Sequence, residues 1–75
     1  MIKEHERIVL AKSIPSLGLV AGDVGTVIHL HKGHKAFEVE FVTLDGHALG
    51  VDTVRLSDVR PVGCREVMHA RSLAH

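Results

Sequence analysis

The sequence predicts an all-β fold, a small five-stranded barrel, and three observations support this prediction. Apolar and polar side chains alternate along residues 36–43, with the period of a half-buried strand. Turn signals that contain glycine separate several short runs of strand-forming residues. A chain of 75 residues makes one domain with a small core. We therefore expect short strands that close around few buried side chains.

The first expected strand covers residues 7–10, and a long loop follows it at residues 12–22. The loop is expected because Pro15 lacks a backbone N–H and two glycines interrupt any regular pattern. Three of its side chains are too apolar for a loose surface loop, so we expect the loop to fold back and cover one end of the barrel. These side chains are Leu17, Leu19 and Val20.

A glycine turn at residues 22–25 opens the second expected strand, which runs over residues 25–31. Asp23 holds such a turn by bonding to nearby backbone, and Gly25 within a β-branched run indicates a bulge or a sharp bend. A polar connection at residues 32–35 then leads to the third strand at residues 36–43.

Pairing the apolar faces of the second and third strands predicts a register between them. The facing pairs are Leu30 with Phe37, Ile28 with Val39, Thr26 with Phe41, His29 with Glu38 and Val27 with Glu40. The last pair leaves an apolar side chain outside the core. A bulge near Gly25 that turns Val27 inward, or a loop that covers Val27, would remove this conflict.

The remaining elements complete the barrel. A fourth strand is expected over residues 47–54 with a bend at Gly50, then a helical turn at 56–59 and a closing edge strand at 59–62. Five short strands, a long first loop and a helical turn before the last strand describe an SH3-like barrel. The predicted core is Ile8, Leu10, Val24, Ile28, Leu30, Phe37, Val39, Phe41, Leu49, Val51, Leu56 and Val59.

Two segments follow from this division, a barrel domain at residues 1–62 and a C-terminal tail at residues 63–75. The tail contains good helix formers, with three apolar residues roughly on one stripe. About twelve residues are marginal for an isolated helix in water. The tail is therefore expected to be either a short helix or a disordered segment.

The charge balance and the cysteine count limit the classes of partner and the compartment. Nine basic and nine acidic side chains cancel, so no excess charge indicates nucleic acid or a membrane surface, and low net charge favours self-association. Protonation of all seven histidines would add seven charges and weaken that association at pH 5. The single cysteine, Cys64, the polar N-terminus and the lack of a long apolar run favour the cytoplasm.

No catalytic residue or cofactor is expected. Catalysis by a nucleophile needs a base and an orienting group in reach, and no serine or cysteine of the chain has such a motif around it. Glu38 and Glu40 share a face, as an acid–base pair would, but exposed strand glutamates are common. A domain of this size also has little room for a pocket that excludes water. The chain is therefore not expected to be an enzyme.

A surface metal site is one alternative. His29 and His31 lie two apart on one strand and so share a face, with Glu38 on the facing strand and His34 in the turn. The lysines at positions 32 and 35 would repel a cation. We therefore treat His29, His31 and Glu38 as weak metal candidates beside the plainer interpretation of a solvated polar face.

Binding of single-stranded nucleic acid is a second alternative. Such binding uses stacking aromatics and a basic groove. The chain has no tryptophan or tyrosine, and Phe37 and Phe41 are both predicted on the core face. The same lack of aromatic walls argues against a groove for proline-rich peptides. One small basic tip remains, at Lys32, His34 and Lys35.

Residues 21–28, Ala-Gly-Asp-Val-Gly-Thr-Val-Ile, resemble the KOW-type pattern, in which a glycine turn opens a strand of a small SH3-like barrel. The resemblance implies a weak RNA-binding or ribosome-associated module. Over residues 1–62 the chain also resembles a family of small uncharacterised bacterial proteins. It is similar in its glycine turn and Val-x-Phe strand to the small barrel of nitrile hydratase β subunits, which implies an accessory role. The segments that carry the wider resemblance are 14–15, 22–27, 37–41, 44–46 and 58–62.

Protein–protein interaction is the function that we expect from these observations. A small barrel has open strand edges, and the long loop adds apolar side chains that a partner would cover. We expect contact through an edge strand, helped by Leu17, Leu19 and Val20 or by the tail, and we expect a homo-oligomer.

Overall fold

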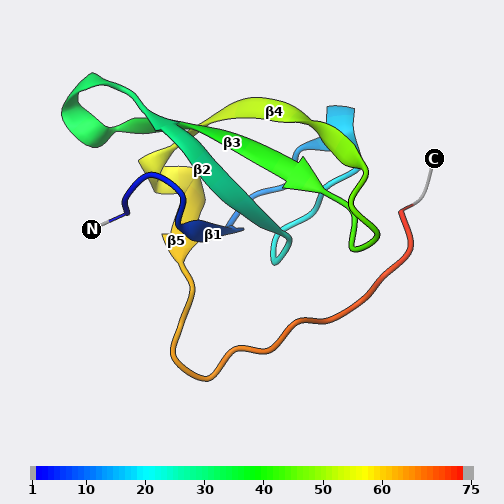
Figure 1. The fold of residues 1–75 in the computed structure, drawn as a ribbon. Coiled ribbons are helices and arrows are strands. Elements are labelled where there is room, and N and C mark those ends of the chain that lie inside the picture. Colours follow the sequence, from blue (N-terminus) through cyan, green and yellow to red (C-terminus); the bar gives the residue numbers. More distant parts are fainter. Residues whose placement is uncertain (1, 74–75) are drawn as a thin grey trace.

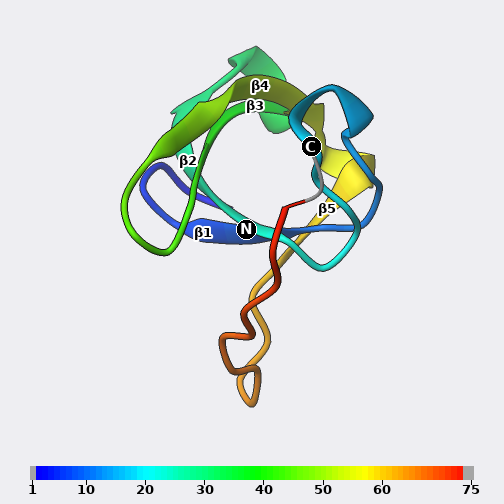
Figure 2. The same cartoon turned by 90° about the vertical axis from the view of Figure 1, so that its right-hand side faces the viewer.

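A computed structural model describes residues 2–73, and it confirms the predicted all-β class (Figure 1). Five antiparallel strands form one sheet in the order β4-β3-β2-β1-β5. Figure 2 shows that the sheet curls around a central core into a barrel-like shape. The strands are β1 (Arg7–Leu10), β2 (Val24–Leu30), β3 (Ala36–Val42), β4 (Ala48–Arg55) and β5 (Val59–Pro61).

Three short 3-10 turns connect these strands, and no longer helix occurs in residues 2–73. They are η1 (Pro15–Leu17), η2 (Lys32–His34) and η3 (Leu56–Asp58). The last of them is the helical turn that was expected before the closing strand. No helix in this described part of the chain is long and apolar enough to cross a membrane.

The core is built from side chains of all five strands and of the first loop. Six predicted core residues are buried: Ile8, Leu10, Phe37, Val39, Phe41 and Val59. Leu30 and Leu49 are half-buried and pack against that core. The prediction was wrong for Val24, Ile28, Val51 and Leu56, which are exposed, and it missed Ile2, Val9, Leu19, Val27 and Val54, which are buried.

A β-bulge explains why the predicted core was wrong along β2. The ladder between β2 and β3 pairs Val27 with Val39 and then His29 with Glu38, so that Ile28 is an extra residue. An extra residue reverses the alternation of faces, which turns Val27 inward and leaves Ile28 outside.

Two of the predicted facing pairs are therefore confirmed, and three are wrong. The confirmed pairs lie on the far side of the bulge, Leu30 with Phe37 and His29 with Glu38. Thr26 faces Glu40 rather than Phe41, and Val27 faces Val39, the partner that had been assigned to Ile28. The irregularity follows Val27, whereas it was expected near Gly25.

Gly25 has a packing reason of its own, because it lies beneath two core side chains. A Cβ atom at this position would be 2.4 Å from Cγ1 of Val39 and 2.6 Å from Cε1 of Phe41. Distances this short do not occur between real Cβ atoms and their neighbours, so any side chain would displace the core. The glycine therefore leaves the space that the side chains of Val39 and Phe41 occupy in the core.

The first loop folds back on the barrel as expected. Leu19 is buried in the core, and the half-buried Leu17 and Ile14 pack beside it. A backbone bridge between Ile14 and Leu19 holds the loop in this shape. Leu17 also lies against Gly50 of β4, where a Cβ would be 3.3 Å from its Cδ2 atom.

The C-terminal tail contains neither helix nor strand over its described residues 63–73, so the helix alternative is wrong for that part. Residues 74–75 lie outside the described part. The tail leaves β5, swings away from the barrel and returns (Figures 1 and 2). Two ion pairs hold it, one from Arg60 to Glu66 and one from Arg71 to Asp23. An isolated helix of this length is marginal in water, and the exposed Val67 and Met68 show that no apolar face of this part of the tail packs on the barrel.

Candidate functional site

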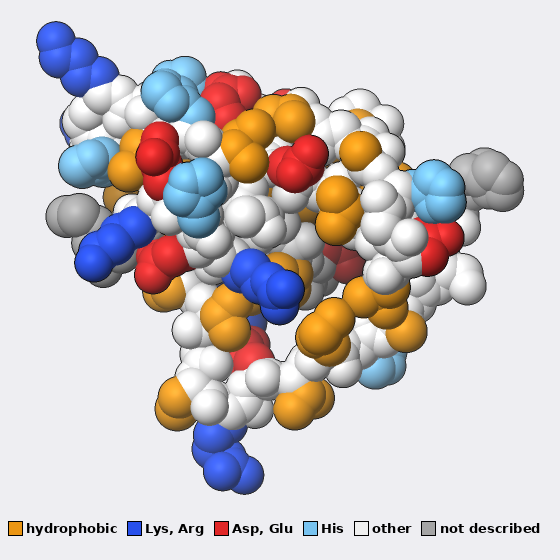
Figure 3. All heavy atoms as spheres, in the orientation of Figure 1, with side chains coloured by type: hydrophobic (Ala, Val, Ile, Leu, Met, Phe, Trp, Pro, Cys, Tyr) orange, Lys and Arg blue, Asp and Glu red, His pale blue; other side chains and the backbone are white. Residues whose placement is uncertain are grey.

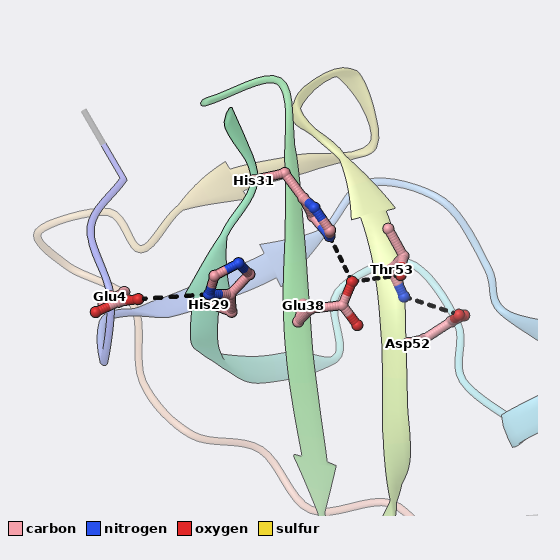
Figure 4. Close-up of polar contacts among 6 residues, drawn as sticks. All are labelled: Glu4, His29, His31, Glu38, Asp52 and Thr53. Carbon is pink, nitrogen blue, oxygen red and sulfur yellow. Dashed lines mark hydrogen bonds and ion pairs between the residues drawn. The ribbon is translucent and has the colours of Figure 1, made fainter. Parts of the chain in front are cut away.

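His31 and Glu38, two of the three predicted metal candidates, meet on the outer face of the sheet at the carboxylate of Glu38 (Figure 4). Nε2 of His31, just after β2, lies 2.5 Å from Oε2 of Glu38 on β3. Since a carboxylate only accepts, the histidine ring donates this bond. The hydroxyl of Thr53 on β4 donates to the same oxygen at 2.6 Å. These two bonds, first from Thr53 and then from His31, lower the pKa of Glu38.

His29 does not join Glu38, although the backbone register places the two residues opposite each other as predicted. Its Nδ1 atom lies 3.9 Å from Oε2 of Glu4 instead, and its ring meets the ring of His31 edge-on with centroids 5.4 Å apart. His34 is exposed in η2. Within residues 2–73 no three histidine, cysteine, aspartate or glutamate side chains are grouped to hold a metal ion. His31 and Glu38 are therefore each other's partners. Together with Thr53 they connect β2, β3 and β4 through their side chains.

The apolar loop that was expected to contact a partner is mostly part of the core. Leu19 is 5% exposed and Leu17 is half-buried, so neither offers its side chain to another molecule. Val20, at 43% exposure, is the member of the trio that remains at the surface. A contact surface for a partner therefore has to be found elsewhere, at the edges of the sheet.

One edge of the sheet, on β5, offers almost no hydrogen-bond donor. In its antiparallel pairing with β1, Val9 faces Arg60, and Ala11 donates to the carbonyl of Asp58. Because hydrogen-bonded residues alternate in an antiparallel ladder, the backbone N–H and C=O groups of Val59 and Pro61 point away from β1. Pro61 has no N–H, and the N–H of Val59 is already bonded to the carbonyl of Leu56. This edge is short and closed.

The opposite edge, on β4, is eight residues long and partly open. The carbonyl of Ala36 accepts from His31 on the β2 side of β3, so the facing residue Arg55 directs its backbone away from the sheet. The same alternation directs Val51 and Thr53 outward. The N–H of Thr53 is bonded to its neighbour Asp52, at 2.9 Å from Oδ1, whereas those of Val51 and Arg55 have no partner within residues 2–73.

A surface hollow of about 280 Å³ lies beside this edge. Residues 52–55 of β4 form one side of it, and residues 12–15 of the first loop lie across from them. An ion pair from Lys12 to Asp58, with 3.2 Å between Nζ and Oδ1, joins two of the residues that line it. The backbone edge of β4 therefore borders a space that the chain itself leaves unfilled.

Sequence reasoning named an edge strand as a contact but did not identify β4, and it missed Asp52. The edge depends on strand order, which no local pattern reveals. Asp52 did leave a signal, because it is a charged residue whose side chain lies on the core face of β4, the face that it shares with Gly50 and Val54. Inward charges on an edge strand are a known means of limiting unwanted pairing.

Comparison with known proteins identifies the chain at the level of a family. No curated protein and no solved structure matches the chain. One family model, described as a domain of unknown function (DUF4926), matches residues 4–61. This match covers all five strands and the loops between them, which is well over half of the chain. The protein therefore belongs to the DUF4926 family.

Proposed function

We propose that the protein is a non-enzymatic module that binds another protein chain by adding an extended segment of it to β4. The observation that carries this proposal is the unpaired edge of β4, with free backbone donors at Val51 and Arg55. Backbone hydrogen bonds supply affinity in this mode of recognition, and side-chain pockets supply specificity. The hollow beside residues 52–55 gives a segment that is added there room for its side chains.

A second copy of the chain is the first partner to consider. Antiparallel pairing of two β4 edges about a two-fold axis at Thr53 would place Val51 opposite Arg55 of the other copy. Such an interface uses the same patch twice, as most symmetric dimers do. The zero formal net charge at neutral pH opposes this approach very little.

The strand order and the turn η3 before β5 support the SH3-like assignment that the sequence favours. They do not make RNA the better ligand. Both phenylalanines of the chain, Phe37 and Phe41, are 1% exposed and offer no stacking surface. In Figure 3 the acidic, basic and histidine side chains are interspersed on this face and form no basic stripe. Protein is therefore the class of partner that we propose, in a reducing cytoplasmic setting that suits the exposed free thiol of Cys64.

The sharpest test changes the backbone of the edge and leaves the rest of the strand unaltered. Val51→Pro removes an outward N–H without removing a bond to β3, and Val51→Ala at the same position keeps the N–H but shortens the side chain. We expect Val51→Pro to lose self-association in sedimentation velocity at high micromolar concentration, while Val51→Ala keeps it. Circular dichroism and thermal melts establish that both variants are folded.

Three results would contradict the proposal. Association of Val51→Pro that equals the parent would show that the β4 edge is not the contact. Equal loss in both variants would indicate a contact through the valine side chain. In the third case the parent stays monomeric. If Val51→Pro and Val51→Ala then capture the same proteins from lysate, strand addition at β4 is excluded altogether. Should Val51→Pro not fold, Val51→Lys places a charge on the same edge and takes its place.

A further inference from the structure

The turn between η1 and β2 holds the side chain of Arg71 by three hydrogen bonds. Nε of Arg71 donates to Oδ1 of Asp23 at 3.0 Å, and Nη2 donates to Oδ2 of the same carboxylate. Nη2 also donates to the backbone carbonyl of Gly18 at 3.2 Å. A two-pronged contact to a carboxylate together with a carbonyl acceptor matches the planar fork of a guanidinium group.

The barrel domain arranges these acceptors itself. The backbone N–H of Val20 donates to Oδ2 of Asp23 at 2.8 Å, and the N–H of Asp23 donates back to the carbonyl of Val20 at 3.1 Å. Gly18 adopts a left-handed conformation, with a φ of 72°, at the end of η1. The carboxylate is therefore held by its own turn, and with Arg71 in place 19% of the Asp23 side chain is exposed.

The C-terminal tail, which supplies the arginine, is otherwise weakly attached to the barrel. Its other ion pair, from Arg60 to Glu66, joins residues six apart and fixes only the start of the tail. Val67 and Met68 lie between the two ion pairs and are 89% and 70% exposed. Among the contacts described for residues 67–73, the polar ones to the barrel are those of the Arg71 guanidinium.

The acceptors lie inside the region that matches the family, whereas the arginine lies outside it. The match to DUF4926 covers residues 4–61 and so includes Gly18 and Asp23. It ends before the tail that contributes Arg71. The acceptor pair is thus part of the family domain, and the side chain that fills it comes from a segment beyond the matched region.

We propose that the carboxylate of Asp23 and the carbonyl of Gly18 form a binding site for an arginine side chain on an extended peptide, which Arg71 occupies from within the same chain. We name this pair the arginine site. A tethered arginine competes with an external one because its effective concentration is about millimolar for a short flexible linker. The tail therefore blocks the site in the free protein, and an arginine-bearing segment of another chain binds when the tail is displaced.

The test uses the full-length chain with Arg71→Ala, which empties the site and leaves the acceptors in place. The probe is a fluorescein-labelled peptide with the sequence of residues 66–73, and its partner probe carries alanine in place of the arginine. We expect Arg71→Ala to bind the arginine peptide at least tenfold more tightly than the parent does, measured by fluorescence anisotropy. The alanine peptide should bind neither protein.

Two matched controls locate the effect. Asp23→Asn, added to Arg71→Ala, keeps an oxygen acceptor for the Val20 N–H but removes the charge, and it should abolish binding. Glu66→Gln releases the other ion pair of the tail and should leave the affinity of the Arg71→Ala variant unchanged. Val51→Pro should also leave it unchanged, which separates this site from strand addition at β4.

Other results would overturn the proposal. These are equal binding of the two peptides to Arg71→Ala, equal binding after Asp23→Asn, or no binding by the folded Arg71→Ala variant at millimolar peptide. If Arg71→Ala fails to fold, Arg71→Lys is used instead. That variant keeps a positive charge but loses the fork, and the same order of affinities is expected.

Discussion

The β4 and β5 edges of the same sheet are closed in different ways. At β5 the closure is local, since Pro61 has no N–H and the N–H of Val59 is hydrogen-bonded within the turn that precedes it. At β4 a single side chain, that of Asp52, covers one of three outward donors. The β5 edge has no free outward donor, whereas the β4 edge is covered only at its centre. Under the strand addition that we propose, the β4 edge is therefore the place where a partner segment pairs.

The difference extends to how firmly each edge strand is held. β4 pairs with β3 from Ala36 to Val42 and is also braced through Thr53 and Glu38, whereas β5 has three residues. A strand that receives a partner has to stay on its own sheet while it does so. The longer ladder and the side-chain brace satisfy that requirement at β4.

The largest expected effect is the loss of stability when a core side chain is truncated, compared between a residue beside β4 and one on β5. Phe41 lies opposite Gly50 of β4 and is 1% exposed, and Val59 of β5 is 7% exposed. Phe41→Ala should lower the free energy of unfolding by about 3–5 kcal/mol, and Val59→Ala by about 2 kcal/mol, because fewer buried carbons are removed. Urea unfolding measures both. Equal costs would mean that the two edge strands depend on the core to the same degree.

Removal of the cap on β4 is the next largest change. Asp52→Ala frees the N–H of Thr53, so that three successive outward donors face solvent. We expect self-association to strengthen about tenfold, which corresponds to ~1.4 kcal/mol, or ~0.7 kcal/mol for each of the two Thr53 N–H bonds that the two-fold interface gains. Asp45→Ala, in the turn between β3 and β4, makes the same charge change away from the edge and serves as the control. Sedimentation equilibrium measures the difference, and weaker association of Asp52→Ala would show that Asp52 takes part in the contact.

The brace on β4 predicts a dependence on pH. Bonds from Thr53 and then from His31 hold the pKa of Glu38 below its ordinary value of 4.5. A lowered carboxyl pKa stabilises the fold above the unfolded value, and this contribution is lost as the pH falls below it. The urea midpoint of the parent should therefore fall more steeply than that of Glu38→Gln between about pH 5 and pH 3. Glu40→Gln, on the same face of β3, is the control, and parallel curves for Glu38→Gln and the parent would exclude the brace.

Much of the fold could be predicted because its signals are local. The alternation along β3, the glycine turn before β2 and Pro61 at the end of β5 each identify an element within a few residues. The prediction of buried residues was wrong along β2 because the bulge at Ile28 adds one residue to a pattern with a period of two. The register predicted from the sequence left the apolar Val27 outside the core, and the bulge removes that conflict by turning Val27 inward.

The candidate sites were harder to predict because they depend on contacts between distant residues. Sequence spacing placed His29, His31 and Glu38 together, yet it did not distinguish which histidine bonds to the carboxylate. The bond from Arg71 to Asp23 joins residues 48 apart, and no pattern in either segment indicates the other. The loop was expected both to cover one end of the barrel and to contact a partner, and the sequence did not decide between these roles for Leu19, which is buried in the core.

The smallest expected effect comes from opening β5. Pro61→Ala restores an outward N–H to that edge, and it should lower the free energy of unfolding by only about 0.4–1 kcal/mol, because the unfolded chain gains conformational freedom. Self-association should not increase, since the N–H of Val59 stays bonded to Leu56 and the strand has only three residues. Sedimentation equilibrium beside Asp52→Ala makes the comparison direct. If Pro61→Ala associates as strongly as Asp52→Ala, then proline alone closes β5, and the length of β4 is not what makes it the binding edge.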